Sequence, residues 1–169
     1  NKGTIQNLRL DNVKINSSDI FTSDFRVGFI CGYSTAGNII NCHVRNGLFN
    51  ISKLSGGWEY FGGIVGHNKS SNTTISKCSS EFTITNLIGT GVLIYVGGIA
   101  GYNEYASSKI EYCYSKIKGR LQIDNTTIAD KTTTYYFGGI AGSATTINNC
   151  YSVVDVEVLA NLSAGSASI

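Results

Sequence analysis

The chain has 169 residues, of which 42% are hydrophobic and 14% charged, with a formal net charge of +2. This hydrophobic content supports a packed core and excludes a wholly disordered chain. No two Lys or Arg residues are adjacent, so the charge pattern disfavours nucleic acids and anionic membrane surfaces as partners. No apolar stretch approaches the roughly 20 residues of a membrane-spanning helix, and no targeting segment opens the chain. We therefore expect no membrane insertion of this segment.

In chain order, a partial unit precedes four units that share one pattern. The partial unit contains the segment IQNL, with Ile5 and Leu8. A glycine-rich phrase then returns as VGFICGY at 27–33, FGGIVGH at 61–67, VGGIAGY at 96–102 and FGGIAGS at 137–143. Its equivalent positions Phe29, Gly63, Gly98 and Gly139 are 34, 35 and 41 residues apart. A fixed period of this size identifies a repeat architecture.

A second motif, Ile-x-x-Cys, follows each phrase. Its four copies are Ile39–Cys42, Ile75–Cys78, Ile110–Cys113 and Ile147–Cys150. Alternation of period two follows the cysteines, as in CYSVVDVEV at 150–158, and this is typical of a half-buried strand. The alternation predicts inward side chains at Cys78, Ser80, Phe82 and Ile84, at Cys113, Ser115 and Ile117, and at Cys150, Ser152, Val154, Val156 and Val158. The linking segments are rich in Ser, Thr, Asn and Gly, so we expect no helix.

One unit of about 35 residues cannot bury its apolar face alone, but stacked units can bury a continuous core. The repeats therefore predict an all-β fold, a parallel β-solenoid (β-helix) of about four to five coils, right-handed as parallel crossovers usually are. Equivalent residues would stack as ladders: isoleucines (Ile5, Ile39, Ile75, Ile110, Ile147), Leu8 with the cysteines (Cys42, Cys78, Cys113, Cys150), and corner glycines (Gly62, Gly63, Gly66, Gly97, Gly98, Gly101, Gly138, Gly139, Gly142).

The domain prediction has three parts. Residues 1–26 form a partial N-terminal coil, residues 27–158 form four repeats stacked as one domain, and residues 159–169 are a linker or the start of a further coil. Methionine and proline are absent and the first residue is Asn1, so we expect an internal segment or a mature product of a larger protein.

The phrases FGGIVG, VGGIAG and FGGIAG, each followed by an Ile-x-x-Cys strand, resemble the GLUG repeat. The resemblance covers about residues 27–158, and its first copy departs from the pattern at Phe29 and Cys31. It implies a module of bacterial surface or secreted proteins, such as filamentous-haemagglutinin-like adhesins and the non-catalytic region of immunoglobulin A1 peptidases. From it we expect a stalk or display scaffold at an extracellular or cell-surface location, whose partners are flanking domains and a host glycan or surface protein.

Neither the glycines nor the cysteines indicate a cofactor or a metal. A phosphate-binding glycine loop needs a following helix, and none is expected after Gly97, Gly98 and Gly101. The paired Cys-x-x-Cys spacing of metal sites is also absent. The cysteine ladder favours free, buried thiols, with a bridge between Cys31 and Cys42 left open.

Catalysis is not expected. The outward acids Glu81, Glu111, Asp155 and Glu157 are scattered, and His43 and His67 have no matched acid or nucleophile nearby in the sequence. We therefore predict that the chain is not an enzyme, and rank a polysaccharide-active solenoid enzyme below a binding or structural module.

Tyrosines indicate a possible binding face. Arg26, Tyr60, Tyr95 and Tyr136 alternate with the apolar Val27, Phe61, Val96 and Phe137, so they form an outer stripe if the apolar residues point inward. Stacked tyrosines are suited to sugar rings or to a protein partner. The alternative is that a loop or a neighbouring domain covers them, and the pattern leaves both open.

Two further surface features remain open. Thr73–Thr74, Thr145–Thr146 and Ser107–Ser108 form an irregular array that an ice-binding solenoid could use. Six Asn-x-Ser/Thr sequons (Asn16, Asn50, Asn68, Asn72, Asn125, Asn161) are also compatible with a glycosylated surface protein.

Overall fold

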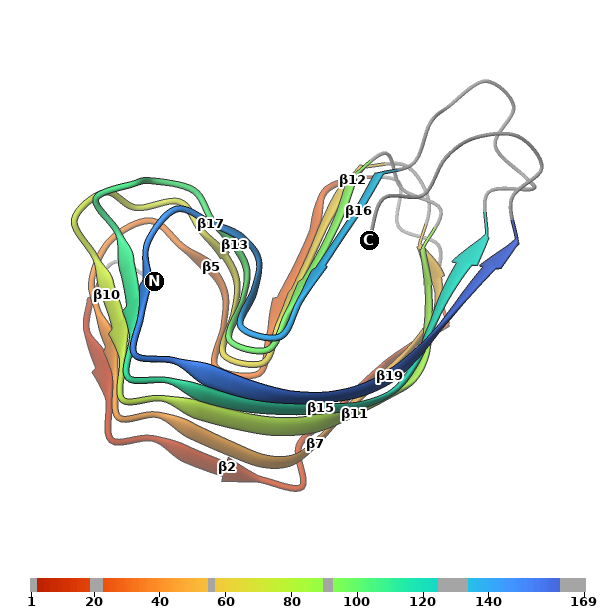
Figure 1. Ribbon diagram of the computed structural model, residues 1–169, viewed down its shortest axis with the longest axis horizontal. Coiled ribbons are helices and arrows are strands. Elements are labelled where there is room, and N and C mark those ends of the chain that lie inside the picture. The colour runs from red at the N-terminus through yellow and green to blue at the C-terminus, as the bar shows by residue number, and fades with distance from the viewer. Residues whose placement is uncertain (1–2, 19–22, 55–56, 90–92, 125–133, 162–169) are drawn as a thin grey trace.

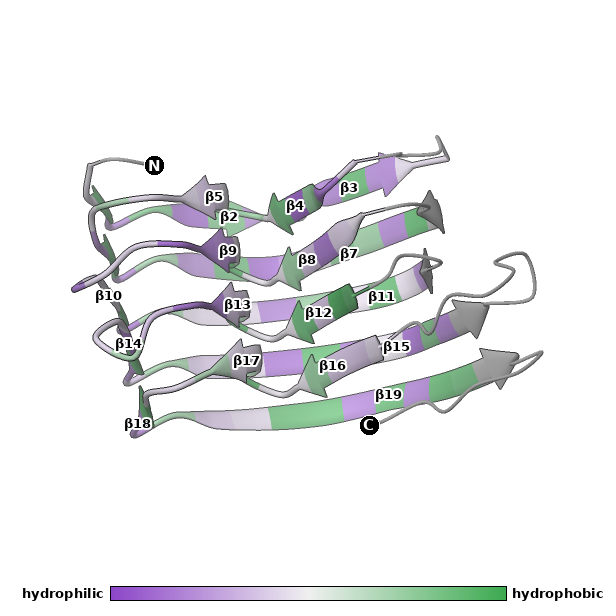
Figure 2. Ribbon diagram, turned by 90° about the horizontal axis from the view of Figure 1, so that it is seen from above, coloured by the Kyte–Doolittle hydropathy of each residue, from purple (hydrophilic) through white to green (hydrophobic). Residues whose placement is uncertain are grey.

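The computed structural model describes residues 3–18, 23–54, 57–89, 93–124 and 134–161, and this part of the chain is all-β, without a helix. Figure 1 shows the chain winding through successive coils, and Figure 2 shows the coils stacked as rungs. Each strand pairs in parallel with its equivalents in the neighbouring coils. The predicted parallel β-solenoid is confirmed, with about four turns. Among these residues, no helix could span a membrane.

Four parallel sheets run along the stack. The long sheet contains β2 (Arg9–Asp11), β7 (His43–Leu54), β11 (Ser79–Gly89), β15 (Tyr114–Asp124) and β19 (Tyr151–Asn161), and β3 (Lys14–Ser17) also pairs with β7. The corner sheet contains β1 (Ile5–Gln6), β6 (Ile39–Ile40), β10 (Thr74–Ser76), β14 (Lys109–Glu111) and β18 (Ile147–Asn148).

The other two sheets contain the strands on either side of the glycine phrase. The upstream V sheet contains β4 (Phe25–Gly28), β8 (Trp58–Gly62), β12 (Leu93–Gly97) and β16 (Thr134–Gly138). The downstream V sheet contains β5 (Cys31–Ser34), β9 (Val65–Asn68), β13 (Ala100–Asn103) and β17 (Ala141–Ala144). Figure 1 shows the upstream V sheet running down toward the long sheet and the downstream V sheet running back up, so that each coil is folded inward as a V.

The tip of the V rests on the long sheet. There Ser80 Oγ donates a hydrogen bond to the carbonyl oxygen of Gly98, and Ser115 Oγ donates one to that of Gly139. A Cβ on Gly98 would overlap both the Gly139 oxygen and Ser115 Oγ. The predicted glycine corner is thus confirmed, and the reason for glycine is lack of space between neighbouring backbones.

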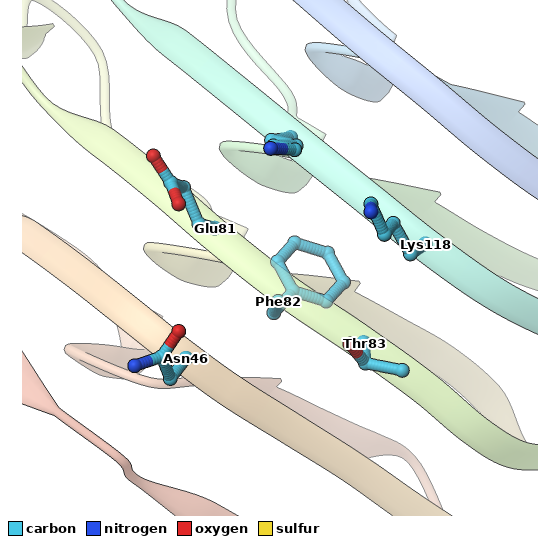
Figure 3. A pocket seen from close by; sticks show the side chains of 6 residues that line it. Asn46, Glu81, Phe82, Thr83 and Lys118 are labelled. Atoms are coloured by element: carbon cyan, nitrogen blue, oxygen red, sulfur yellow. The ribbon is translucent and has the colours of Figure 1, made fainter.

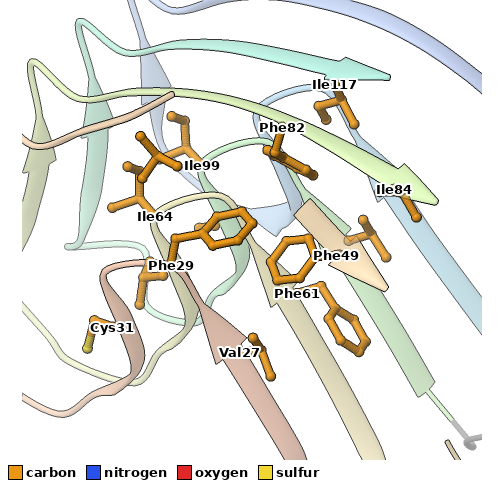
Figure 4. Packing of buried hydrophobic residues seen from close by; sticks show 14 of the residues in the cluster. Val27, Phe29, Cys31, Phe49, Phe61, Ile64, Phe82, Ile84, Ile99 and Ile117 are labelled. Carbon is orange, nitrogen blue, oxygen red and sulfur yellow. The ribbon is translucent and has the colours of Figure 1, made fainter. Parts of the chain in front are cut away.

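In the first coil the same corner is filled by a phenylalanine in place of glycine. Phe29 occupies the position of Gly63, and its ring stacks on Phe49 at 4.2 Å and meets Phe82 edge-on at 5.8 Å. Space for the ring comes from Gly47, because a Cβ there would lie only 2.9 Å from it. Val44 takes the place of the serine, since it pairs with Ser80. Figure 4 shows the aromatic cluster that results.

The predicted inner ladders are present. Ile39, Ile75 and Ile110 are paired in register and buried, whereas Ile147 is 43% exposed because β18 is the edge strand of the corner sheet within the described part of the chain. Leu8 at the other end is also exposed. The inward positions predicted for 78–84 and 113–117 are buried as well.

All five cysteines are free thiols. Cys42, Cys78 and Cys113 are buried, and each thiol lies within hydrogen-bonding distance of the carbonyl of an isoleucine in the preceding coil, as Cys78 does with Ile39 at 3.5 Å. The expectation of free, buried thiols thus holds for four of the five cysteines, whereas Cys150 in the last described coil is only partly buried, and Cys31 and Cys42 are not bridged.

The turn from the corner sheet into the long sheet uses a left-handed backbone residue in every coil. The residue before each ladder cysteine, or before Leu8, has a φ between 51° and 58°: Asn7, Asn41, Lys77, Tyr112 and Asn149. Asn adopts this conformation more readily than Lys or Tyr. The turn conformation is therefore kept even where the residue type is unfavourable.

Candidate functional site

The tyrosine stripe lies outside the coil interior, as the alternation predicted, but it faces into the V. Tyr60 stacks on His67 at 4.4 Å and Tyr95 stacks on Tyr102 at 4.9 Å, so rings from the two V sheets cover one another. Tyr60 is 1% exposed, Tyr95 is 9% exposed and Tyr136 is 41% exposed. A role of these three tyrosines in partner binding stays a prediction, but the structure leaves only Tyr136 largely accessible.

The contact between the tyrosine stripe and a second column of rings was missed from the sequence, although that column itself is evident in the repeats. Tyr33, His67, Tyr102 and Ser143 occupy one column of the downstream V sheet. The signal was present, because these residues follow the glycine corner at one fixed position. Their contact with the tyrosine stripe depends on how sharply the chain reverses at that corner.

Charged groups surround the first coils of the stack. The Arg26 guanidinium lies 4.7 Å from the centre of the Tyr33 ring and 5.6 Å from that of Tyr60, and Arg26 also bonds Asp24 at 2.6 Å. His67 Nε2 pairs with Glu104 Oε2 at 2.9 Å. His67 thus has an acidic partner that proximity in the sequence did not reveal, because Glu104 is 37 residues away and lies in the next coil.

Burial controls the ionisation of the ring groups. It lowers the pKa of His67 even though Glu104 acts in the opposite direction, so the imidazole is neutral at neutral pH. Burial likewise raises the pKa of Tyr60, which keeps its phenol protonated. The stack therefore presents neutral rings beside the Arg26–Asp24 ion pair and the Glu104 carboxylate.

Among these residues of the first coils lies a depression of about 380 Å³, which we call the V-end pocket. Its lining residues are Asp24, Arg26, Trp58, Tyr60, His67, Lys69, Tyr102 and Glu104. Trp58, the only tryptophan of the chain, is 46% exposed, and its ring centre lies 6.5 Å from that of Tyr60. Sequence reasoning overlooked Trp58, although it lies two residues before Tyr60 and hence on the same face of the strand.

A second depression, of about 170 Å³, lies on the outer face of the long sheet (Figure 3). It is lined by Asn46, Glu81, Phe82, Thr83, Lys116 and Lys118. Glu81 is the only acid there. The other outward acids are elsewhere, with Glu111 in β14 and Asp155 and Glu157 in β19. These four acids do not converge, and the absence of catalysis stays a prediction.

Within the described ranges, no three His, Cys, Asp or Glu side chains are placed to share a metal ion. His43, the other histidine, contacts Ser79 Oγ at 2.9 Å and Asn41 Oδ1 at 3.0 Å. These partners orient the ring as part of the sheet surface.

The Thr/Ser array is not a flat exposed surface. Thr73 and Ser108 are buried, and Thr73 Oγ1 donates to Ser108 Oγ at 3.2 Å. The sequon residue Asn68 is also buried, and its Nδ2 donates to Asn103 Oδ1 at 2.7 Å, so this fold cannot carry a glycan there. Asn125 lies outside the described residues, as does the side chain of Asn161.

The fold and its ladders define the chain as a β-solenoid repeat module. A family model, the GLUG motif, matches residues 93–118. This segment runs from β12 through β13 and β14 into β15, and so contributes to all four sheets of one coil. No curated protein and no solved structure matches the chain.

Proposed function

We propose that the chain is a non-catalytic repeat module of a larger extracellular or cell-surface protein, where it acts as a stalk or display scaffold. The observation that carries the proposal is the register of the stack. From β15 to β19 the pairing runs without a shift from Tyr114–Tyr151 to Asp124–Asn161, and the V sheets pair without a shift through every coil. A stack of equivalent rungs forms a rod whose length is set by the number of coils.

The GLUG match supports a setting like that of the adhesins and the non-catalytic peptidase region named above. In such a setting the direct partners are the flanking domains of the same protein, and the module holds them apart. A more specific proposal is that the module itself also adheres to a host glycan or surface protein.

Scaffold function predicts that a whole coil is dispensable. Deleting residues 110–146 joins Lys109 to Ile147, which is the register partner of Ile110. We expect the shortened protein to fold, to unfold cooperatively in circular dichroism, and to be shorter in small-angle X-ray scattering by about one strand spacing, ~4.8 Å.

The matched control deletes residues 110–124 alone, which removes β15 and most of β14 but leaves the V strands of that coil, and we expect it not to fold. If the whole-coil deletion also failed to fold, the idea of interchangeable rungs would be wrong.

The surface location is tested separately. Brief protease treatment of intact cells that express the full-length protein should release peptides of this module, while a cytosolic marker protein stays intact. Release only after cell lysis would contradict the proposed location.

Carbohydrate binding along the whole stripe of Tyr60, Tyr95 and Tyr136 receives less support, because two of the three rings are covered. An ice-binding role is likewise not favoured, because Thr73 and Ser108 point inward.

A further inference from the structure

We propose that the V-end pocket binds a neutral sugar ring, with Trp58 as the stacking platform. This inference goes beyond the scaffold function and does not depend on it. The pocket volume of about 380 Å³ lies within the range of about 300–1,000 Å³ that small-molecule sites occupy.

The aromatic part of the pocket combines an accessible ring with a buried one. Trp58 is about half exposed, whereas the neighbouring Tyr60 is almost fully buried and lies between His67 and Tyr95. An indole that is about half exposed and tilted against a buried tyrosine suits the apolar C–H face of a pyranose, because aromatic side chains supply amphipathic contact area with little loss of entropy.

The rim supplies the hydrogen-bonding groups that sugar hydroxyls need. The side chains of Asp24, Arg26 and Glu104 are 42%, 30% and 25% exposed, so each keeps part of its polar edge open. Carboxylates accept and guanidinium donates in fixed planes, which matches pairs of neighbouring hydroxyls. Arg26 is bonded to Asp24 and Glu104 to His67, so these groups are held in place before a ligand arrives.

The charges favour a neutral ligand. Arg26 and Lys69 balance Asp24 and Glu104, and His67 is neutral, so the formal charge of the lining is zero. This balance disfavours a phosphate or a strongly acidic ligand. A quaternary ammonium ligand is also disfavoured, because the guanidinium of Arg26 already lies over the Tyr33 and Tyr60 rings where such a cation would bind.

Because Trp58 is the only tryptophan, its fluorescence reports on this pocket alone. The experiment screens the chain on an array of neutral glycans and then titrates it with retained glycans and with lactose, maltose, cellobiose and N-acetyllactosamine, using choline and inorganic phosphate as comparison ligands. We expect a saturable change of Trp58 emission with at least one neutral sugar, and none with choline or phosphate.

Two variants locate the site by calorimetry. Trp58→Ala should weaken sugar binding by about tenfold or more, as loss of a central aromatic contact does. Tyr151→Ala removes a 66% exposed aromatic residue from the long sheet and should bind like the parent protein. Circular dichroism confirms that both variants fold, and Trp58→Phe should retain part of the affinity if Trp58→Ala does not fold.

The proposal is overturned if no neutral glycan is retained on the array and no tested sugar changes the emission, if only choline or phosphate does so, or if binding survives Trp58→Ala. None of these results bears on the coil deletion, which leaves every residue of the V-end pocket in place. Failure of sugar binding is therefore distinguishable from failure of the scaffold proposal.

Discussion

At the scale of single residues, the tip of the V leaves no space for one additional carbon atom. Gly98 has no room for a Cβ, because the backbone of the next coil and the Ser115 side chain fill the space. The pairing of a glycine corner with a facing serine, and of Phe29 with Val44 in the first coil, shows that the corner and the long sheet are matched to each other.

Gly98→Ala should therefore lower the free energy of unfolding by about 3 kcal/mol or more, because either the Gly139 backbone or Ser115 must move. Gly3→Ala is the matched control, since no atom lies within 4 Å of a Cβ there. Urea unfolding of both variants checks the expectation. Equal unfolding free energies of Gly98→Ala and Gly3→Ala would contradict the expectation, because they would show that the corner accommodates a Cβ without cost.

At the scale of elements, the turn between the corner sheet and the long sheet uses a left-handed residue in each coil. Three coils place Asn in this position, whereas Lys77 and Tyr112 adopt it at φ of 54° and 53°. A non-glycine residue in this region is strained, and Asn is less so because its short side chain bonds locally. The turn is thus imposed by pairing along the stack and not by local preference.

Tyr112→Asn should raise the free energy of unfolding by about 0.5–1 kcal/mol, because it relieves this strain. The corresponding rise in Tm is about 1–4 °C for a chain of this size, measured by thermal unfolding. Tyr112→Ala serves as the control, since it removes the exposed ring without supplying the Asn preference. A gain as large with Ala as with Asn would attribute the effect to the tyrosine side chain instead.

At the scale of the whole molecule, a buried carboxyl links stability to pH. Glu59 points inward beside Phe61, is 2% exposed, and its Oε2 atom has no hydrogen-bond partner among the described residues. Burial raises the pKa of Glu59 from its ordinary 4.5 to about 8. Since the folded state then holds a proton that the unfolded state has lost, the contribution of Glu59 to stability is highest below about pH 4.5 and falls as the pH rises to about 8.

Between these limits the Glu59 contribution to the unfolding free energy falls by up to about 1.4 kcal/mol per pH unit. Glu59→Gln keeps the shape of the side chain and should remove this part of the slope. Urea unfolding of both proteins at several pH values measures this slope. The contribution of His67 to the pH dependence is present in both proteins and cancels when their unfolding free energies are subtracted. Glu81→Gln is the control at an outward position. Identical pH dependences of the unfolding free energy for the parent and Glu59→Gln would show that Glu59 does not hold a proton in the folded state.

Much of the fold was predictable because repetition converts sequence alignment into spatial contact. Once Ile39, Ile75 and Ile110 are aligned, parallel pairing places them above one another, and the alternation then assigns inward and outward faces. The same argument located the glycine corner. It failed at the C-terminal edge of the stack, where Ile147 and Val154 continue the inward pattern but are exposed, since no strand of the described residues pairs with the outer side of β18 or β19.

The candidate site was only partly predictable, because it joins residues from different columns. Tyr60 and Arg26 were identified on one sheet, but Trp58 and the pair of His67 with Glu104 were not. Nothing in a repeat pattern reports the angle between the two sheets that meet at the glycine corner. That angle decides whether the tyrosines form an open stripe or a closed stack.

The sequence alone determined the class of fold, the coil register, the inner ladders and the position of the corner. These properties follow from period and alternation, which any stacked arrangement must respect. Only the tertiary structure decided that each coil folds inward, that the rings of two sheets cover one another, and that one exposed tryptophan remains above a charge-balanced pocket. Those features depend on the close approach of Gly98 to Ser115 and its equivalents, a long-range contact that local patterns do not specify.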